Sequence, residues 1–271
     1  MSGAHNDGLM VGLMVVGLEI GLRALDAAEP RLGDPRLLIG AVVIVAASAV
    51  KVPAILALGY LGLVWARRLG ARWVDVARVG GYLAAVTAAI YLPLTLAVGP
   101  RWITAPTQPT GVLSLMSPTT DLALVIGRVG ELMGFADPTG TALDVLTTLG
   151  VGVAVVIVAA TLVATLRSDR EPLALLAVGM AAVAVLAVPT QPWYFLWALA
   201  PFAATPAPAR VLRWIALVTL ATALLLPPTG TDFVARGFEL VNALAAAAVL
   251  LTAVLLVDAR RRGAIPKTSV C

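Results

Sequence analysis

The chain has 271 residues, of which 60% are hydrophobic and only 13% charged, and its mean hydropathy is +0.97. This composition excludes an ordinary soluble domain and indicates an integral membrane protein. The net charge of +4 does not indicate a nucleic-acid partner, because the basic residues are spread over short connections and do not form one stripe.

Long apolar stretches recur along the whole chain. Several reach the roughly 20 residues that a helix needs to cross a bilayer core of about 30 Å. We therefore predict an all-α fold, a polytopic transmembrane helix bundle that occupies residues 1–271 as a single domain. Its nine expected segments are 9–25, 36–50, 52–66, 79–98, 142–166, 172–188, 193–206, 210–226 and 238–257.

Residues 36–66 are ambiguous between one helix and two. A single helix would be about 45 Å long at about 1.5 Å per residue, too long for the bilayer without strong tilt. The sequence Val50-Lys51-Val52-Pro53 offers a break, since proline is tolerated in the first turn of a helix but not inside it. We expect two short helices that meet at Lys51.

The basic residues support this choice and predict an orientation in the plasma membrane. With the N-terminus outside, the connections 23–36, 67–78, 167–171 and 207–213 and the tail after 258 are cytoplasmic and hold 15 of the 19 basic residues. The external face then receives the N-terminal triplet, Lys51, the connection 99–141, Gln191 to Tyr194 and residues 227–237. The unusual polar residues thus share one face.

The triplet His5-Asn6-Asp7 precedes the first apolar run and contains the only histidine of the chain. One interpretation is a helix cap, because Asn and Asp side chains accept hydrogen bonds from the first turn of a helix. The other is a binding site, because three polar side chains at a membrane surface can orient a sugar or a metal-bound phosphate.

Two charges interrupt the apolar segments. Lys51 either extends toward the interface or directs its ammonium at a lipid phosphate. Glu19 lies about 18 Å deeper than Asp7 along an ideal helix, and an ion pair and a functional role are both open for it.

Aromatic and amide side chains follow Pro189. Gln191, Trp193 and Tyr194 join two short segments, with Trp197 one turn further on. Tryptophan and tyrosine often mark the membrane interface, but they also stack on sugar rings while polar groups bind the hydroxyls. The same two interpretations apply to Trp102 beside Arg101.

The connection 99–141 contains a further apolar pattern. Residues 111–135 have near-helical spacing after Ser117-Pro118, which predicts a helix lying in the interface and capped by Thr120 or Asp121. Packing on the rim of the bundle and contact with substrate are both open for this helix.

Common catalytic motifs are missing. The sequence has no glycine-rich phosphate loop, no CxxC or HExxH spacing and no GxSxG turn, and its lone cysteine, Cys271, cannot form an internal disulfide. We expect no cofactor, and the sequence leaves open whether a divalent metal is needed.

Three stretches resemble one known family. AHNDGLMVGLMVVGL, SAVKVPAILALGYLG and QPWYFLWALAP are similar to stretches of the actinobacterial polyprenyl-phosphate-mannose-dependent alpha-1,6-mannosyltransferases, membrane enzymes of the GT-C fold class. The resemblance covers essentially the whole chain, and the first stretch is the most specific. It implies the C-terminal half of such an enzyme, in which the catalytic carboxylate lies upstream of residue 1 and an N-terminal half is encoded separately or missing.

The resemblance also implies substrates and roles. The implied partners are the surrounding membrane lipids, the donor polyprenyl-phosphate-mannose and, as acceptor, a growing mannan glycolipid. The resemblance implies no nucleotide sugar and no nucleic acid. Lys51 and Arg101 are expected to bind the donor phosphate, and the triplet His5-Asn6-Asp7 to position donor or acceptor. Gln191, Trp193 and Tyr194 are expected at the sugar or the lipid head group.

Two other classes of function remain open. A flippase or transporter of lipid-linked sugars would use the same polar cluster, although the two halves of the chain show no repeat of broken helices. A non-catalytic scaffold in a membrane complex is the third interpretation.

Overall fold

A computed structural model describes residues 3–27, 31–99, 117–187, 190–206 and 208–225, and positions 248, 252 and 255. Within these ranges all regular structure is helical, which confirms the all-α prediction. The chain divides into two compact units, residues 2–205 and residues 206–271 with Met1. The prediction of one domain over residues 1–271 stays a prediction.

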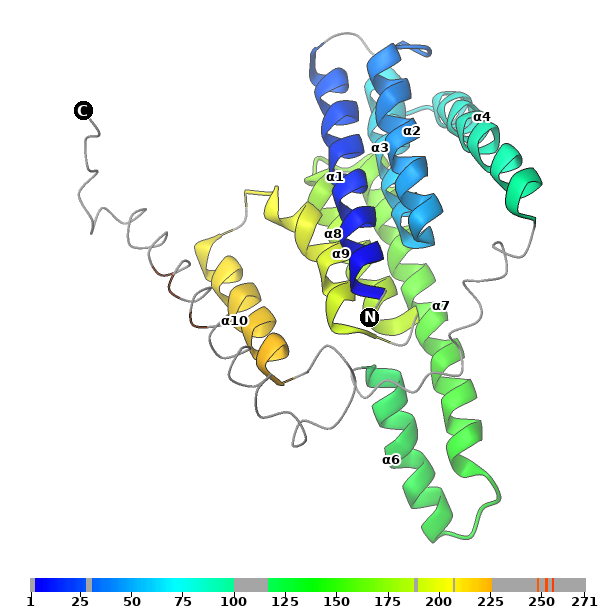
Figure 1. The fold of residues 1–271 in the computed structure, drawn as a ribbon, viewed down its shortest axis with the longest axis vertical. Helices are drawn as coiled ribbons and strands as arrows, with labels where there is room; N and C mark the ends of the chain where they lie inside the picture. The colour runs from blue at the N-terminus through cyan, green and yellow to red at the C-terminus, as the bar shows by residue number, and fades with distance from the viewer. Residues whose placement is uncertain are drawn as a thin grey trace. The chain divides into compact units, whose positions relative to one another are not determined.

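Figure 1 labels the helices of both units. The first unit contains α1 (Gly3–Ala27), α2 (Pro35–Val50), η1 (Val52–Ala54), α3 (Ile55–Leu69), α4 (Trp73–Val98), α6 (Pro118–Leu132), α7 (Pro138–Arg167), α8 (Pro172–Ala182), η3 (Val183–Ala187), η4 (Pro192–Tyr194) and α9 (Phe195–Ala203). The second contains α10 (Ala209–Leu225). Over the described residues, four stretches are long and apolar enough to span a membrane: Asn6–Ala27, Val52–Leu69, α4 and α7.

The chain breaks at Lys51, as predicted. Lys51 ends α2 with extended backbone angles (φ −155°, ψ 123°), and Pro53 lies in the following short helix η1. Helix α3 then runs back along α2, so that Gly40 of α2 and Leu61 of α3 both lie against Gly21 of α1. The proline and the extended residue before it therefore make a helical hairpin.

Helices α1 and α2 approach each other so closely that only glycine fits between them. A Cβ atom on Gly17 would lie 2.8 Å from the carbonyl oxygen of Gly40, and one on Gly40 would lie 2.8 Å from the carbonyl oxygen of Gly17. Small residues permit such backbone contact between membrane helices. This contact fixes α1 against α2 near the middle of both helices.

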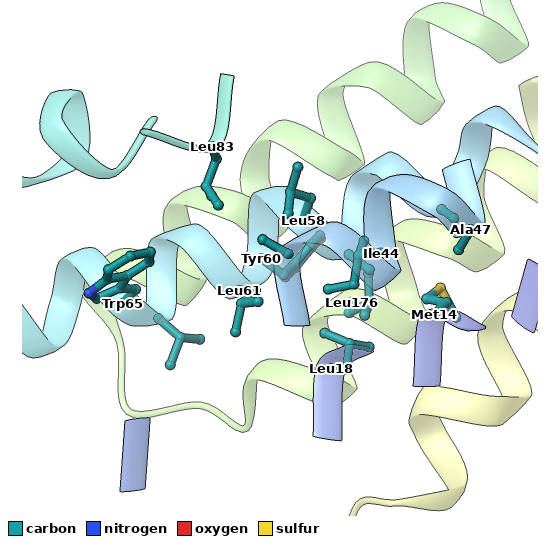
Figure 2. Packing of buried hydrophobic residues seen from close by; sticks show 14 of the residues in the cluster. Met14, Leu18, Ile44, Ala47, Leu58, Tyr60, Leu61, Trp65, Leu83 and Leu176 are labelled. Carbon is teal, nitrogen blue, oxygen red and sulfur yellow. The ribbon is translucent and has the colours of Figure 1, made fainter. Parts of the chain in front are cut away.

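The core lies where α1, α2, α3 and α8 meet (Figure 2). Its largest fully buried side chains include Trp65, Tyr60, Met14, Ile44 and Leu176. The Tyr60 hydroxyl is hydrogen-bonded to the Thr161 hydroxyl and donates to the Leu175 carbonyl oxygen at 3.3 Å. This polar contact ties α3 to α7 and α8 inside an otherwise apolar interior.

Two ends of this first unit differ in their charged residues. We name the arginine end after Arg67, Arg68, Arg72 and Arg167, which lie where α3 and α7 end and α4 begins. There, Arg67 donates to the Ser168 carbonyl oxygen at 2.6 Å, and Arg68 meets Asp26 at 2.6 Å. The opposite end, named the Lys51 end, contains the start of α1 and the turn at Lys51. The described residues of the predicted cytoplasmic connections 23–36, 67–78 and 167–171 thus gather at one end, while their side of the membrane stays a prediction.

Several element boundaries differ from the sequence predictions. Helix α1 begins at Gly3 where 9 was predicted, α3 ends at Leu69 where 66 was predicted, and α7 begins at Pro138 where 142 was predicted. Helix α4 starts at Trp73, six residues before the predicted start at 79, because Arg72 and Asp75 form a charged capping box at 2.9 Å that an apolar pattern does not reveal. Helix α9 ends at Ala203, three residues early. The predicted segment 238–257 lies outside the described residues, apart from three helical positions.

The predicted caps of the helix in the long connection are wrong. Helix α6 begins at Pro118 with Ser117 at its N-cap, so Thr120 and Asp121 already belong to its first turn. It packs antiparallel to the start of α7, where Gly127 and Gly130 lie against Thr139 and Pro138. That α6 lies in the membrane interface stays a prediction.

Candidate functional site

Four side chains from distant parts of the sequence meet at the Lys51 end. Asp7 comes from the second turn of α1, Lys51 from the break between α2 and η1, and Tyr194 and Trp197 from η4 and α9. Two prolines lie close to three of these residues in the chain: Pro53 is in the short helix that follows Lys51, and Pro192 begins the short helix that contains Tyr194 and precedes Trp197. We call these four residues the Asp7–Lys51 cluster.

Asp7 is the buried center of the cluster. Its side chain is 0% exposed and accepts hydrogen bonds from Lys51 Nζ at 2.9 and 2.8 Å and from Trp197 Nε1 at 2.6 Å. The capping interpretation of Asp7 is wrong, because α1 begins four residues earlier at Gly3. Its carboxylate instead joins α1 to the α2–α3 turn and to α9.

The Lys51 ammonium lies between the carboxylate and two aromatic rings. Nζ is 4.0 Å from the ring centroid of Tyr194 and 5.0 Å from that of Trp197, and these two rings stack with centroids 4.3 Å apart. Such cation–π contacts add to the ion pair. The ammonium binds a buried group, so the interpretation that it merely extends toward the interface is wrong.

The two members of the pair differ in their access to solvent. The Lys51 side chain is 26% exposed, whereas Asp7 is fully covered. Burial lowers the pKa of Lys51 from its usual 10.5, and the hydrogen bond and charge of Asp7 oppose that change. A ligand arriving at this end therefore meets the cation and not the carboxylate.

The other predicted site residues are distributed as follows. Trp193 is half-buried and packs edge-on against Tyr194 at 6.3 Å. Gln191 is half-buried at the start of η4, where its carbonyl oxygen accepts from the Tyr194 N–H at 2.9 Å. Asn6 is exposed on α1 beside Asp7, and His5 belongs to α1 while its side chain is not among those described.

Arg101 lies outside the described residues, as does Trp102. Their predicted roles stay predictions.

Of the two interpretations of Glu19, the structure supports the ion pair. It pairs with Arg23 at 2.5 Å, one helical turn away, and both side chains are more than half exposed. This is an ordinary surface pair, and it lies apart from the Asp7–Lys51 cluster.

Trp197 was not predicted as a site residue. The sequence placed it only among the aromatic residues of the interface, but it is 1% exposed and its indole donates to Asp7. The available signal was its position four residues after Trp193 and next to the polar turn, which puts both on one helix face.

The cluster fixes the position of its own cation, the Lys51 ammonium. Among the described residues no three His, Cys, Asp or Glu side chains gather in one place, so the cluster is not a ready-made set of metal ligands. Its chemistry is that of an ammonium held by a carboxylate and two rings, while the indole N–H of Trp197 donates to the same carboxylate. A fixed ammonium suits an anionic ligand.

Comparison with known proteins identifies the family. The sequence model described as "MptB C-terminal domain" matches residues 119–257, and the one described as "Alpha-(1->6)-mannopyranosyltransferase, N-terminal domain" matches residues 1–67. The chain belongs to the MptA/MptB family. The resemblance predicted from three sequence stretches is thereby confirmed.

Curated members of the MptA/MptB family match over most of the chain. A probable alpha-(1->6)-mannopyranosyltransferase of Mycolicibacterium smegmatis is 33% identical over 96% of this chain and 50% of its own length. An alpha-(1->6)-mannopyranosyltransferase of Mycobacterium tuberculosis is 32% identical over 93% and 49%, and that named B of Corynebacterium glutamicum is 31% identical over 75% and 35%. The chain thus spans about half the length, or less, of these relatives. No solved structure matches it.

Proposed function

We propose that this chain is the part of a membrane mannosyltransferase that binds the phosphate of a lipid-linked sugar donor. The donor is polyprenyl-phosphate-mannose, and the acceptor is a growing alpha-1,6-linked mannan glycolipid. Two findings support this: the names of the relatives, and a cation fixed at one end of a helix bundle.

The observation that carries the proposal is the geometry of Lys51. Its ammonium has three N–H donors, of which two bind the oxygens of Asp7. The side chain is 26% exposed, so an anion can reach this cation. Because Asp7 and the two rings restrict the ammonium, it needs little rearrangement when negative charge develops on a phosphate.

The reaction exchanges one bond at the anomeric carbon. The acceptor 6-hydroxyl oxygen bonds to C1 of mannose, the bond from C1 to the phosphate oxygen breaks, and the electron pair stays on the phosphate. Lys51 stabilises that charge. The hydroxyl proton passes to a carboxylate, which we expect in the part of the relatives that this chain does not cover.

Asp7 has a positioning role in this proposal. A carboxylate that is 0% exposed and binds two donor groups is not placed to meet an acceptor hydroxyl. It orients Lys51, while Tyr194 and Trp193 offer ring faces to the sugar or the lipid head group.

The test measures mannosyl transfer in membranes that contain this chain and a candidate N-terminal half. The decisive variant combines Asp7→Asn with Lys51→Met, which removes both charges and leaves no unpaired buried ion. We expect the transfer rate to fall by about 10²–10³-fold, as when a charge-stabilising donor is lost.

Asp26→Asn with Arg68→Met is the matched control, because it removes an ion pair of similar length at the arginine end. We expect it to keep the rate of the parent chain. A double variant at the Lys51 end with normal expression and an unchanged rate would refute the role of Lys51.

A further inference from the structure

A large cavity opens between α3 and α4 and is distinct from the Asp7–Lys51 cluster. It has a volume of about 1130 Å³, slightly above the range of about 300–1,000 Å³ typical of ligand sites. On α4 it is lined by Gly80, Ala84 and Ala88, which recur at every helical turn and carry little or no side chain. Because no bulky side chain fills this strip, the two helices leave a groove between them.

Leu83 makes one of the contacts that attach α4 to the bundle. Leu83 extends from α4 to the core, as Figure 2 shows, and a Cβ atom on Gly62 of α3 would lie 2.7 Å from its Cδ1 atom. Val79 is the second buried apolar side chain of α4. Most of the remaining surface of α4 faces away from the core.

The walls of the groove are chemically apolar. Among the hydroxyl-bearing residues that line it, Thr87 donates to the Leu83 carbonyl oxygen at 2.8 Å, and Thr95 donates to the Tyr91 carbonyl oxygen at 2.7 Å. The Tyr91 hydroxyl is hydrogen-bonded to Ser48 at 2.7 Å. Because these groups already have partners, the groove suits a hydrocarbon better than a polar ligand.

The groove has the length of the membrane interior, and one of its ends is next to Lys51 in the chain. Its lining runs along α4 from Val76 to Thr95, about 28 Å at about 1.5 Å per residue, close to the bilayer core of about 30 Å. Its last lining residue on the other side is Val52, which directly follows Lys51 in the chain. This end of the groove is therefore next in the chain to the residue that carries the candidate cation.

We infer that the groove between α3 and α4 binds the hydrocarbon chain of a lipid phosphate, whose head group lies at Lys51. This inference rests on the proposed function for the identity of the lipid, a polyprenyl phosphate. Three observations carry it: the apolar walls, the length of the groove, and its end at Val52, the residue that follows Lys51.

The test is photo-crosslinking with a polyprenyl monophosphate that carries a diazirine in the middle of its chain. The full chain is used in membranes. The decisive variant is Gly80→Leu, which fills the groove, because nothing lies within 4 Å of a Cβ atom built at this position. Gly81→Leu is the matched control: it also has open space around it, and it does not line the groove.

We expect label on peptides from α3 and α4, and about a tenfold loss of labelling in Gly80→Leu but not in Gly81→Leu, equivalent to about 1.4 kcal/mol of binding. The pair Ala84→Phe and Ala85→Phe repeats the comparison one turn further along, in case the first variant does not fold. Equal labelling within both pairs would overturn the inference.

Two further results would also overturn it. Competition by excess phosphatidylglycerol would mean an ordinary lipid-facing surface, and loss of label on co-expression of an N-terminal half would mean that a protein helix fills the groove. Because labelling reports binding, groove-specific label without mannosyl transfer supports the groove and counts only against the proposed function.

Discussion

The two ends of the bundle use the same ion-pair chemistry in opposite surroundings. At the arginine end, Arg68 meets Asp26 at 2.6 Å with side chains 48% and 71% exposed. At the Lys51 end, the distance to Asp7 is 2.8 Å, but the carboxylate is fully buried. The distances are alike, so burial decides what each pair does. Exposed pairs contribute little, whereas a broken buried pair leaves an ion without solvent.

The largest expected effect comes from Lys51→Met, which leaves the Asp7 carboxylate buried without its cation. We expect a loss of about 3–5 kcal/mol in the free energy of unfolding, the usual result of breaking a buried pair. Arg68→Met should cost no more than about 1 kcal/mol, because its partner stays in solvent. Unfolding by SDS in mixed micelles measures both, and equal losses would refute the contrast between the two ends.

A double-mutant cycle sharpens the comparison. Adding Asp7→Asn to Lys51→Met removes the stranded charge, so the double variant should be more stable than Lys51→Met alone, with a coupling energy of up to about 3 kcal/mol. The cycle of Arg68→Met with Asp26→Asn should give a coupling near zero. The same unfolding assay applies, and additive losses at Asp7 and Lys51 would mean that the pair does not act as a unit.

Trp197→Phe tests the indole bond to Asp7 separately from the stacking of the rings. Phenylalanine keeps a ring against Tyr194 but has no N–H, so we expect a loss of about 1.5–3 kcal/mol, as for hydrogen bonds to charged groups. Trp193→Phe is the control, because the Trp193 ring packs edge-on against Tyr194. Similar losses in the two variants would assign the Trp197 effect to packing alone.

The pH dependence gives the smallest effect. The pKa of Lys51 lies below the usual 10.5, so the ammonium loses its proton as the pH rises through a value under 10.5, and transfer should decline there. In that window the unfolded chain binds more protons than the folded one, so stability does not fall with the rate. Lys51→Arg should remove this decline, because arginine does not titrate in this range. A decline that persists in Lys51→Arg would assign it to another group.

The sequence predicted the break at Lys51 because proline and length restrict a membrane helix strongly. It also placed Asp7, Lys51 and Tyr194 on one face, since alternating helices send every second connection to the same side. Trp197 was missed, because the rotation of α9 decides whether an indole faces lipid or core. The capping prediction for Asp7 failed because apolar spacing did not show that α1 extends back to Gly3.

The groove could not be predicted from the sequence at all. Gly80, Ala84 and Ala88 form a pattern that also occurs where membrane helices pack tightly together. Only the position of α4 against α3, to which Leu83 and the Tyr91–Ser48 hydrogen bond contribute, turns this strip into a cavity instead of a contact.

The backbone contact between Gly17 and Gly40 is the point about which α1 and α2 can tilt relative to each other. Asp7 lies ten residues from Gly17 along α1, and Lys51 lies eleven residues from Gly40 at the end of α2. Each separation corresponds to about 15 Å of helix. A tilt of about 4° at the glycine contact would displace Asp7 or Lys51 by about 1 Å, about a third of the length of their ion pair. A methyl group added at either glycine would therefore act on Lys51 from the middle of the membrane.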